Sequence, residues 1–141
     1  MRCKRQAAVV PGTDERDLAR IRRICFRFPE VEEAELQDRP LFRVRTRRFA
    51  LFNGAQAPQR QRWNAFGRSL HFLAEPQERF ALLADARFVP SPHHGDRDWL
   101  ALDLECADID WVEVAELLEA AYRQAANREL TVILDERPRR N

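Results

Sequence analysis

The stretch "RPLFRVRTRRFALFN", from Arg39 to Asn53, alternates apolar and basic side chains in the way a half-buried β-strand does. Arg43 and Arg45 are expected on one side of the strand, and a turn near residues 46–47 would fold the stretch into an antiparallel hairpin. The apolar positions expected to share the other side are Phe42, Val44, Phe49 and Leu51. The sequence therefore predicts a hairpin with one apolar face and one basic face.

Helical and strand patterns continue on both sides of this hairpin. Thr13 is predicted to cap a helix whose apolar positions recur at helical spacing and which ends by Pro29. The elements expected after the hairpin are a strand over 69–74, a short helix from Pro76, a strand over 98–104, a helix from Asp110 to about residue 126, and a short strand over 129–134. This order predicts an α+β fold, a two-layer α/β sandwich with a mostly antiparallel sheet.

The length and composition are those of one globular domain. The 141 residues are 33% charged and 45% hydrophobic. We predict an N-terminal arm over 1–12, a single domain over 13–134 and a C-terminal tail over 135–141. The sequence has no long apolar run of membrane type and no signal-peptide pattern, and its three cysteines lie far apart. These features predict a cytoplasmic protein with reduced thiols and no structural zinc.

Charge is strongly segregated along the chain, although the formal net charge is only +1. Residues 39–68 hold eight arginines and no acid, whereas residues 96–119 hold nine acids and the single base Arg97. Segregated charge of this kind indicates a charged partner more directly than the net charge does. Acids from elsewhere in the fold would have to cover the basic stretch to neutralise it.

Four stretches together resemble the MmcQ/YjbR family. They are "RRICFRFPEVEEAE" (22–35), "RPLFRVRTRRFALF" (39–52), "RFVPSPHHGDRDWLALDL" (87–104) and "DIDWVEVAELLEAAYRQAANREL" (108–130). The resemblance covers roughly residues 14–130. It implies a small single-domain protein with a CyaY-like or secretion-chaperone-like α/β sandwich. The sheet of that family has been compared to a double-wing DNA-binding motif, and the resemblance supplies no catalytic residues.

The histidine-containing stretch over 89–104 is interpreted as a turn that leads into a strand. Zinc needs three or four suitably placed ligands, and the adjacent His93 and His94 would point in opposite directions on an extended segment. The alternatives are a metal or acid/base site and a binding role for the imidazoles. Nucleophile motifs and glycine-rich phosphate loops are absent from the sequence. We therefore predict that the protein is not an enzyme and that it needs no metal or other cofactor.

The arginine-rich hairpin and the loop after it are the predicted functional site. Guanidinium groups suit phosphate oxygens, and aromatic residues among them suit stacking on exposed bases. The residues predicted to contact nucleic acid are Arg43, Arg45, Arg47, Arg48, Arg60, Arg62, Trp63 and Arg68. The resulting hypothesis is a DNA-binding protein that contacts phosphates without base-specific readout. The alternatives are a solvated strand face with no partner, and a chaperone-like module that binds a protein or small molecule on its sheet face.

Overall fold

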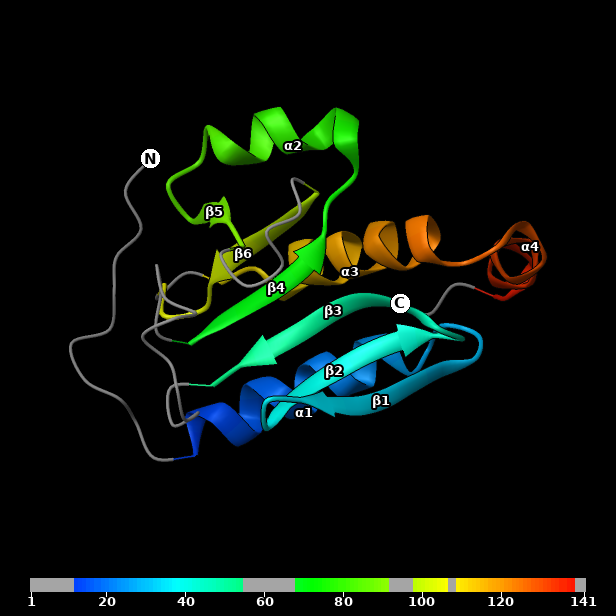
Figure 1. Ribbon diagram of the computed structural model, residues 1–141, viewed down its shortest axis with the longest axis horizontal. Coiled ribbons are helices and arrows are strands. Elements are labelled where there is room, and N and C mark those ends of the chain that lie inside the picture. Colours follow the sequence, from blue (N-terminus) through cyan, green and yellow to red (C-terminus); the bar gives the residue numbers. More distant parts are fainter. Residues whose placement is uncertain (1–11, 55–67, 92–97, 107–108, 139–141) are drawn as a thin grey trace.

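The computed structural model describes residues 12–54, 68–91, 98–106 and 109–138 (Figure 1). Its elements are α1 (Thr13–Cys25), β1 (Val31–Leu36), β2 (Arg39–Val44), β3 (Arg47–Asn53), β4 (Ser69–Leu73), α2 (Pro76–Leu83), β5 (Phe88–Pro90), β6 (Trp99–Asp103), α3 (Trp111–Ala125) and α4 (Arg128–Glu136).

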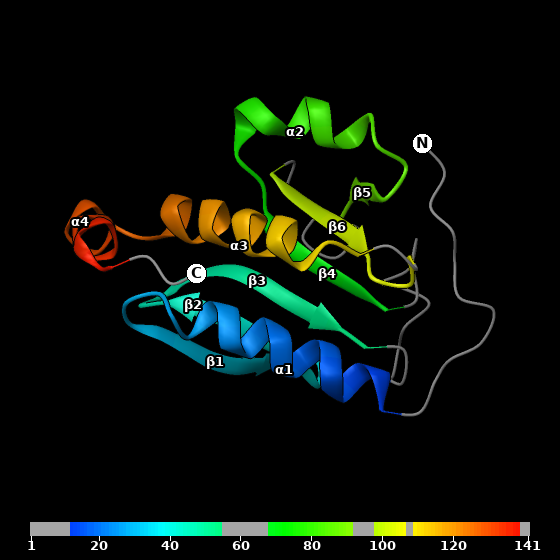
Figure 2. The same cartoon turned by 180° about the vertical axis from the view of Figure 1, so that it is seen from behind.

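The six strands form one antiparallel sheet in the order β1-β2-β3-β4-β6-β5. Helices α1 and α3 lie on one face of the sheet, α2 lies near β5, and α4 follows beyond the end of α3 (Figures 1 and 2). The predicted α+β fold with an antiparallel sheet is confirmed. None of the helices within the described residues is long and apolar enough to cross a membrane.

The main core lies between the sheet and the two helices that cover it. Its centre is aromatic. The centroid of the Phe28 ring lies 4.9 Å from that of the Tyr122 ring and 6.4 Å from that of the Phe49 ring. The Tyr122 hydroxyl is buried in this cluster and donates a 2.8 Å hydrogen bond to the Pro29 carbonyl. A buried phenol needs such a partner, and this one ties α3 to the turn that precedes β1.

One extra residue in β3 decides which hairpin side chains face the helices. Leu41 pairs with Leu51, but Arg43 pairs with Arg48, so the register shifts by one residue between these pairs. The bulge leaves Phe49 without a cross-strand partner and turns its side chain into the main core. Leu51 packs instead with Leu41 in a separate cluster. The prediction that Phe49 and Leu51 share one apolar face is therefore wrong.

Two-residue turns close the first two hairpins. Gln37 and Asp38 have φ values of 52° and 63°, and positive φ at both central positions suits the strand twist of a tight hairpin. The second turn, at Arg45 and Thr46, comes one residue before the predicted position, and Arg45 has a φ of 55°. An arginine in this region is uncommon, because its Cβ crowds the backbone there.

Strand β1 was not predicted, because three of its six residues are glutamates. It lies at the edge of the sheet, where charged side chains prevent pairing with another chain. Glu33 is also held in place: Arg22 of α1 donates two hydrogen bonds of 2.7 Å to its carboxylate. The glutamates therefore mark a protected edge strand rather than a loop.

Side-chain and backbone caps define the helix ends. Asp110 caps α3 as predicted, and its carboxylate accepts hydrogen bonds from the backbone N–H groups of Val112 and Glu113. Gly12, with a φ of 85°, is the N-cap of α1, so the prediction that Thr13 caps this helix is wrong. Helix α1 ends at Cys25, before the predicted stop at Pro29.

The last element is a helix where a strand was predicted. The Asn127 side chain accepts a 3.0 Å hydrogen bond from the Leu130 backbone N–H and so starts α4. Leu130 is fully buried, and Leu134, four residues later, packs on the same core. Because α4 extends to Glu136, residues 135 and 136 belong to the folded part of the chain rather than to the predicted tail.

Candidate nucleic-acid interface

The exposed cations of the hairpin gather at its turn, which we call the hairpin tip and define as Arg43, Arg45, Arg47 and Arg48. Arg43 of β2 lies directly across the ladder from Arg48 of β3. Arg47 and Arg48 are exposed, and neither forms an ion pair with a carboxylate of the described residues. Because residues directly opposite each other in a strand pair lie on the same face, Arg43 and Arg48 share one face of the sheet.

Arg45 is engaged by an acid from another part of the chain. Its guanidinium donates hydrogen bonds of 3.1 and 3.3 Å to the two carboxylate oxygens of Glu30, which lies in the turn before β1. This hydrogen-bonded pairing lowers the pKa of the Glu30 carboxyl group, and the positive charge of Arg45 adds to the effect. Both residues are exposed, so the pair orders two adjacent turns without adding much stability.

Arg43 has a weaker partner. Its Nε lies 3.9 Å from a Glu32 carboxylate oxygen on the neighbouring strand, too far for a hydrogen bond. The Nε atom is itself buried and has no hydrogen-bond partner in the structure. With another arginine across the ladder, Arg43 therefore lies beside a like charge, and its ion pair with Glu32 is long.

Arg68 does not belong to this surface, which corrects its place in the predicted site. Its side chain is 3% exposed, and its Nε lies 2.8 Å from a carboxylate oxygen of Asp17 in α1. Its terminal nitrogen donates a 3.1 Å hydrogen bond to the Leu104 carbonyl. Burial raises the pKa of Asp17, although the charge of Arg68 opposes the rise. Arg68 therefore joins α1 to the sheet and cannot reach a partner molecule.

The remaining predicted site residues, Arg60, Arg62 and Trp63, lie outside the described residues, as do His93 and His94. Within the described part of the chain, no group of three or more histidine, cysteine, aspartate or glutamate side chains is placed to hold a metal ion.

The tip lies at the same end of the molecule as α4, and both views show this (Figures 1 and 2). Burial raises the pKa of the Tyr122 hydroxyl, and the negative charge of Glu30 raises it further. The positive charges of Arg137, Arg123 and Arg45 oppose this rise. Helix α1 begins at the opposite end. The hairpin tip and the start of α1 therefore lie at opposite ends of the molecule.

The YjbR family model matches residues 26–124, which is more than half of the chain. The chain belongs to the YjbR family. The match spans all of the hairpin tip and most of α3, and it confirms the resemblance found in the sequence.

Two solved structures support the fold of this YjbR-family protein. Protein DR2400 of Deinococcus radiodurans, which carries the domain DUF419, aligns with a TM-score of 0.63 and 18% identity over 84% of this chain and 87% of that one. A protein from Pseudomonas syringae aligns with a TM-score of 0.52 and 14% identity over 70% of this chain and 89% of that one. The comparison with curated proteins found no match. At these identities the likeness shows the fold alone.

A chain of buried polar side chains crosses the sheet of this YjbR-family protein on the face away from α1 and α3. Arg39 donates a 2.7 Å hydrogen bond to the side-chain oxygen Oδ1 of Asn53, and the side-chain amide of Asn53 donates one of 3.4 Å to the Ser69 hydroxyl. His71 is hydrogen-bonded at Nε2 to Ser69, at 3.1 Å, and at Nδ1 to Ser91, at 2.8 Å. All five residues are at most 4% exposed. No local sequence pattern predicts this chain of side chains, because the strand register brings its members together.

These contacts favour a structural role for His71. Each ring nitrogen has a serine hydroxyl as a partner, and the imidazole is fully buried. Buried polar groups of this kind fix the register of the strands that carry them, because any shift would leave several of them unsatisfied.

The cysteines depart from the expectation of three reduced thiols. Cys25 is free and buried, and burial raises the pKa of its thiol well above the ordinary value. Cys106, 4% exposed, is disulfide-bonded. The cysteines therefore no longer favour a reducing compartment.

Proposed function

We propose that this YjbR-family protein binds DNA through contacts between the hairpin tip and the phosphate backbone, and that it catalyses no reaction. The observation that carries the proposal is the exposed pair Arg47 and Arg48, which lacks an acidic partner among the described residues. Arg43, across the ladder from Arg48, adds a third guanidinium to the same end of the hairpin. Planar guanidinium groups in this number suit the closely spaced oxygens of a phosphate backbone.

The electrostatics of the tip support an anionic partner. Like charges directly opposite each other destabilise a strand pair, so the Arg43–Arg48 pair costs the isolated fold some stability. A bound phosphate would replace this repulsion with charge-assisted hydrogen bonds. Arg45 is expected to contribute less, because Glu30 already neutralises it.

Recognition at the tip would not depend on base sequence. Phosphate contacts carry no base information, and the helix nearest the tip, α4, exposes Glu129 and Asp135 as well as arginines. In this proposal the loop residues Arg60, Arg62 and Trp63 extend the surface, and the hairpin has the role of a wing in a double-wing motif. A cytoplasmic location is part of the same proposal, because that is where such a protein would meet DNA.

The test is a fluorescence-anisotropy titration of labelled duplex DNA at several salt concentrations. The variant Arg47→Gln/Arg48→Gln is compared with Arg16→Gln/Arg20→Gln, which removes the same charge from exposed positions on α1. We expect the tip variant to bind DNA more weakly and the α1 variant to bind like the wild type. Equal loss in both variants would mean that only net charge matters. No binding by the wild type at low salt would refute the proposal.

The alternative of a ligand on the sheet face has less support. The central strands β4 and β6 are buried on both faces, with Leu70 and Leu102 on the helix side and His71 and Ala101 on the other. A protein or small-molecule partner would therefore need another surface.

A further inference from the structure

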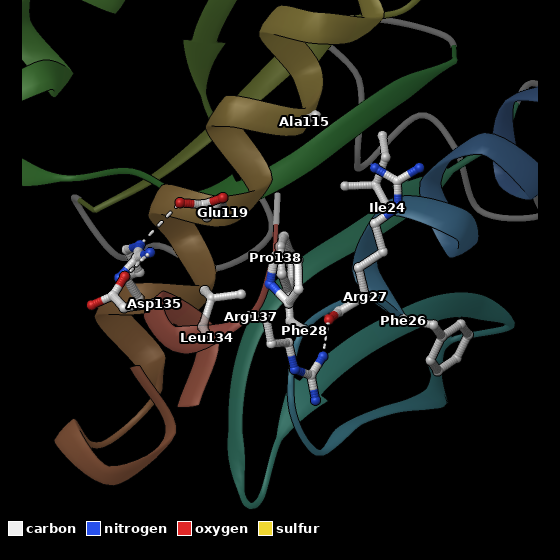
Figure 3. A pocket seen from close by; sticks show the side chains of 11 residues that line it. Ile24, Phe26, Arg27, Phe28, Ala115, Glu119, Leu134, Asp135, Arg137 and Pro138 are labelled. Atoms are coloured by element: carbon white, nitrogen blue, oxygen red, sulfur yellow. Dashed lines mark hydrogen bonds and ion pairs between the residues drawn. The ribbon is translucent and has the colours of Figure 1, made fainter. Parts of the chain in front are cut away.

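Helix α4 lies at one end of the molecule, beyond the end of α3 (Figures 1 and 2). Its inner side belongs to the fold, because Leu130 is fully buried and Leu134 lines the cavity between α1, α3 and α4 (Figure 3). With about 3.6 residues per helical turn, the opposite side of α4 carries Arg128, Val132 and Glu136, which we call its outer side. All three residues are exposed, Val132 by 42%.

The charges on the outer side are the reverse of those that a helix favours. The helix dipole makes acids favourable at the N-terminus and bases favourable at the C-terminus. Arg128 is nevertheless the first residue of α4 and Glu136 is the last, and the last turn holds no base. Neither residue forms an ion pair within the described residues. This pattern therefore costs the isolated chain some stability.

The other two charged side chains of α4 interact with their own chain. A carboxylate oxygen of Asp135 lies 2.7 Å from the Arg123 guanidinium of α3. The pKa of Arg45 is raised chiefly by its hydrogen bonds to Glu30, and the negative charge of Glu129 adds to that rise. The first and last residues of α4 are therefore the two charges of this helix that remain unmatched within the described residues.

We propose that α4 packs against α4 of a second copy of this chain, antiparallel and about a two-fold axis at Val132. Residue 132 is the midpoint of the helix, so Arg128 of each copy would face Glu136 of the other. The same surface then serves both copies, as a two-fold interface requires. The two Val132 side chains meet at the centre, beside Ile133, which is 39% exposed. Each unmatched charge gains the counterion that its own chain does not supply.

The size of this surface sets the expected strength of the dimer. A helix of nine residues offers much less area than the roughly 1,200–2,000 Å² buried in a stable interface. We therefore expect a weak dimer, with a dissociation constant between roughly 10 μM and 1 mM. Because its charge pairs would be exposed at the rim, salt should weaken it further.

Sedimentation equilibrium of the full chain at low salt, up to about 1 mM protein, tests this proposal without DNA and so independently of the proposed function. Arg128→Glu and Glu136→Arg each place like charges at both contacts, so either variant alone should associate about tenfold more weakly or not at all. An equimolar mixture of the two variants should associate again. In the mixed dimer one chain carries acids at both positions and the other carries bases, so both charge pairs are restored.

A matched pair of variants tests the centre of the interface. Val132→Asp should prevent association, whereas Val112→Asp, at a position 70% exposed on α3, should associate like the wild type. Circular dichroism and melting curves show that each variant is folded. A wild type that stays monomeric up to about 1 mM would overturn the proposal. So would association that is unchanged in Arg128→Glu, or a mixture of the charge variants that fails to associate.

Discussion

The two ends of the β2–β3 hairpin use the same residue type in opposite ways. At the open end, where β2 begins and β3 ends, Arg39 is fully buried and hydrogen-bonded to Asn53. The nearby Arg68 is buried against Asp17. At the tip, Arg47 and Arg48 are exposed and unpaired among the described residues. All four belong to the acid-free stretch over 39–68. Their position in the sheet, rather than the local charge density, decides which arginines are structural.

The physical reason is the cost of burying charge. A guanidinium removed from water must recover its hydrogen bonds inside the protein, so buried arginines are found where partners converge. Strand neighbours and helix α1 bring those partners to the open end of the hairpin. At the tip, the side chains of Arg47 and Arg48 remain exposed to solvent. Of these four arginines, only the two at the tip are therefore available to a partner.

The largest expected effect is on stability, for a substitution at the open end of the hairpin. Arg68→Met should lower the free energy of unfolding by about 3–5 kcal/mol, because it leaves Asp17 without its partner in a largely buried site. Arg48→Met at the tip should change it by about 0.5 kcal/mol or less. Urea denaturation at neutral pH measures both.

The double variant Asp17→Asn/Arg68→Met is the control for this comparison. Removing both charges should restore part of the stability lost in Arg68→Met, since no unpaired carboxylate remains. Similar losses for Arg68→Met and Arg48→Met would show that the two ends do not differ in the way we describe.

A smaller effect should appear in the pH dependence of stability, with opposite sign at the two ends. The pKa of Asp17 is raised in the folded protein, so between its ordinary value of 3.8 and the raised value the folded state binds more protons than the unfolded state. In that window the wild type should lose stability relative to Asp17→Asn as pH rises. The pKa of Glu30 is lowered from 4.5, so the wild type should lose stability relative to Glu30→Gln as pH falls through the lowered value.

Denaturation midpoints of the wild type and both variants from pH 3 to neutrality, in steps finer than one pH unit, check these signs. The same sign for both variants would contradict the assignment of burial as the dominant effect at Asp17 and of pairing as the dominant effect at Glu30.

The smallest effect is expected for Arg45 at the tip. Arg45→Gly removes an exposed ion pair, but glycine adopts the positive φ of 55° without the strain that arginine has there. The free energy of unfolding should therefore change little. DNA binding should weaken less than in Arg47→Gln or Arg48→Gln, because Glu30 already neutralises Arg45. Anisotropy titrations at one low salt concentration make the comparison. A loss equal to that of Arg48→Gln would show that the Glu30 pair opens on binding.

Local patterns in the sequence predicted much of the fold. The Asp110 cap, the β6 strand and the hairpin itself follow from capping residues and alternation. Strand β1 did not, because its glutamates have low strand propensity and only its edge position explains them. The segment "ELTVIL" contains β-branched residues and was predicted to be a strand, but the Asn127 cap and the packing of Leu130 make it helical.

The candidate site was predicted only where its contacts are local. The predicted hairpin pairs Arg43 with Arg48 across its turn, whereas the bulge at Phe49, which moves Leu51 out of the main core, has no clear sequence signal. The pairing of Arg45 with Glu30 joins residues 15 positions apart. Asp17 and Arg68 are in contact in the fold, but strands β1, β2 and β3 separate them in the sequence. Such long-range partners cannot be read from charge counts, so Arg68 was wrongly included.

The central claim is that the arginines at the tip contact phosphates, and that those at the open end of the hairpin and on α1 do not. The most direct measurement is the slope of log affinity against log salt concentration for duplex DNA. Each phosphate contact contributes about 0.9 to that slope. If both side chains contact phosphates, Arg47→Gln/Arg48→Gln should therefore flatten it by about 2 units relative to the wild type, while Arg16→Gln/Arg20→Gln leaves it unchanged. A slope unchanged in the tip variant, with DNA still bound, would contradict the account.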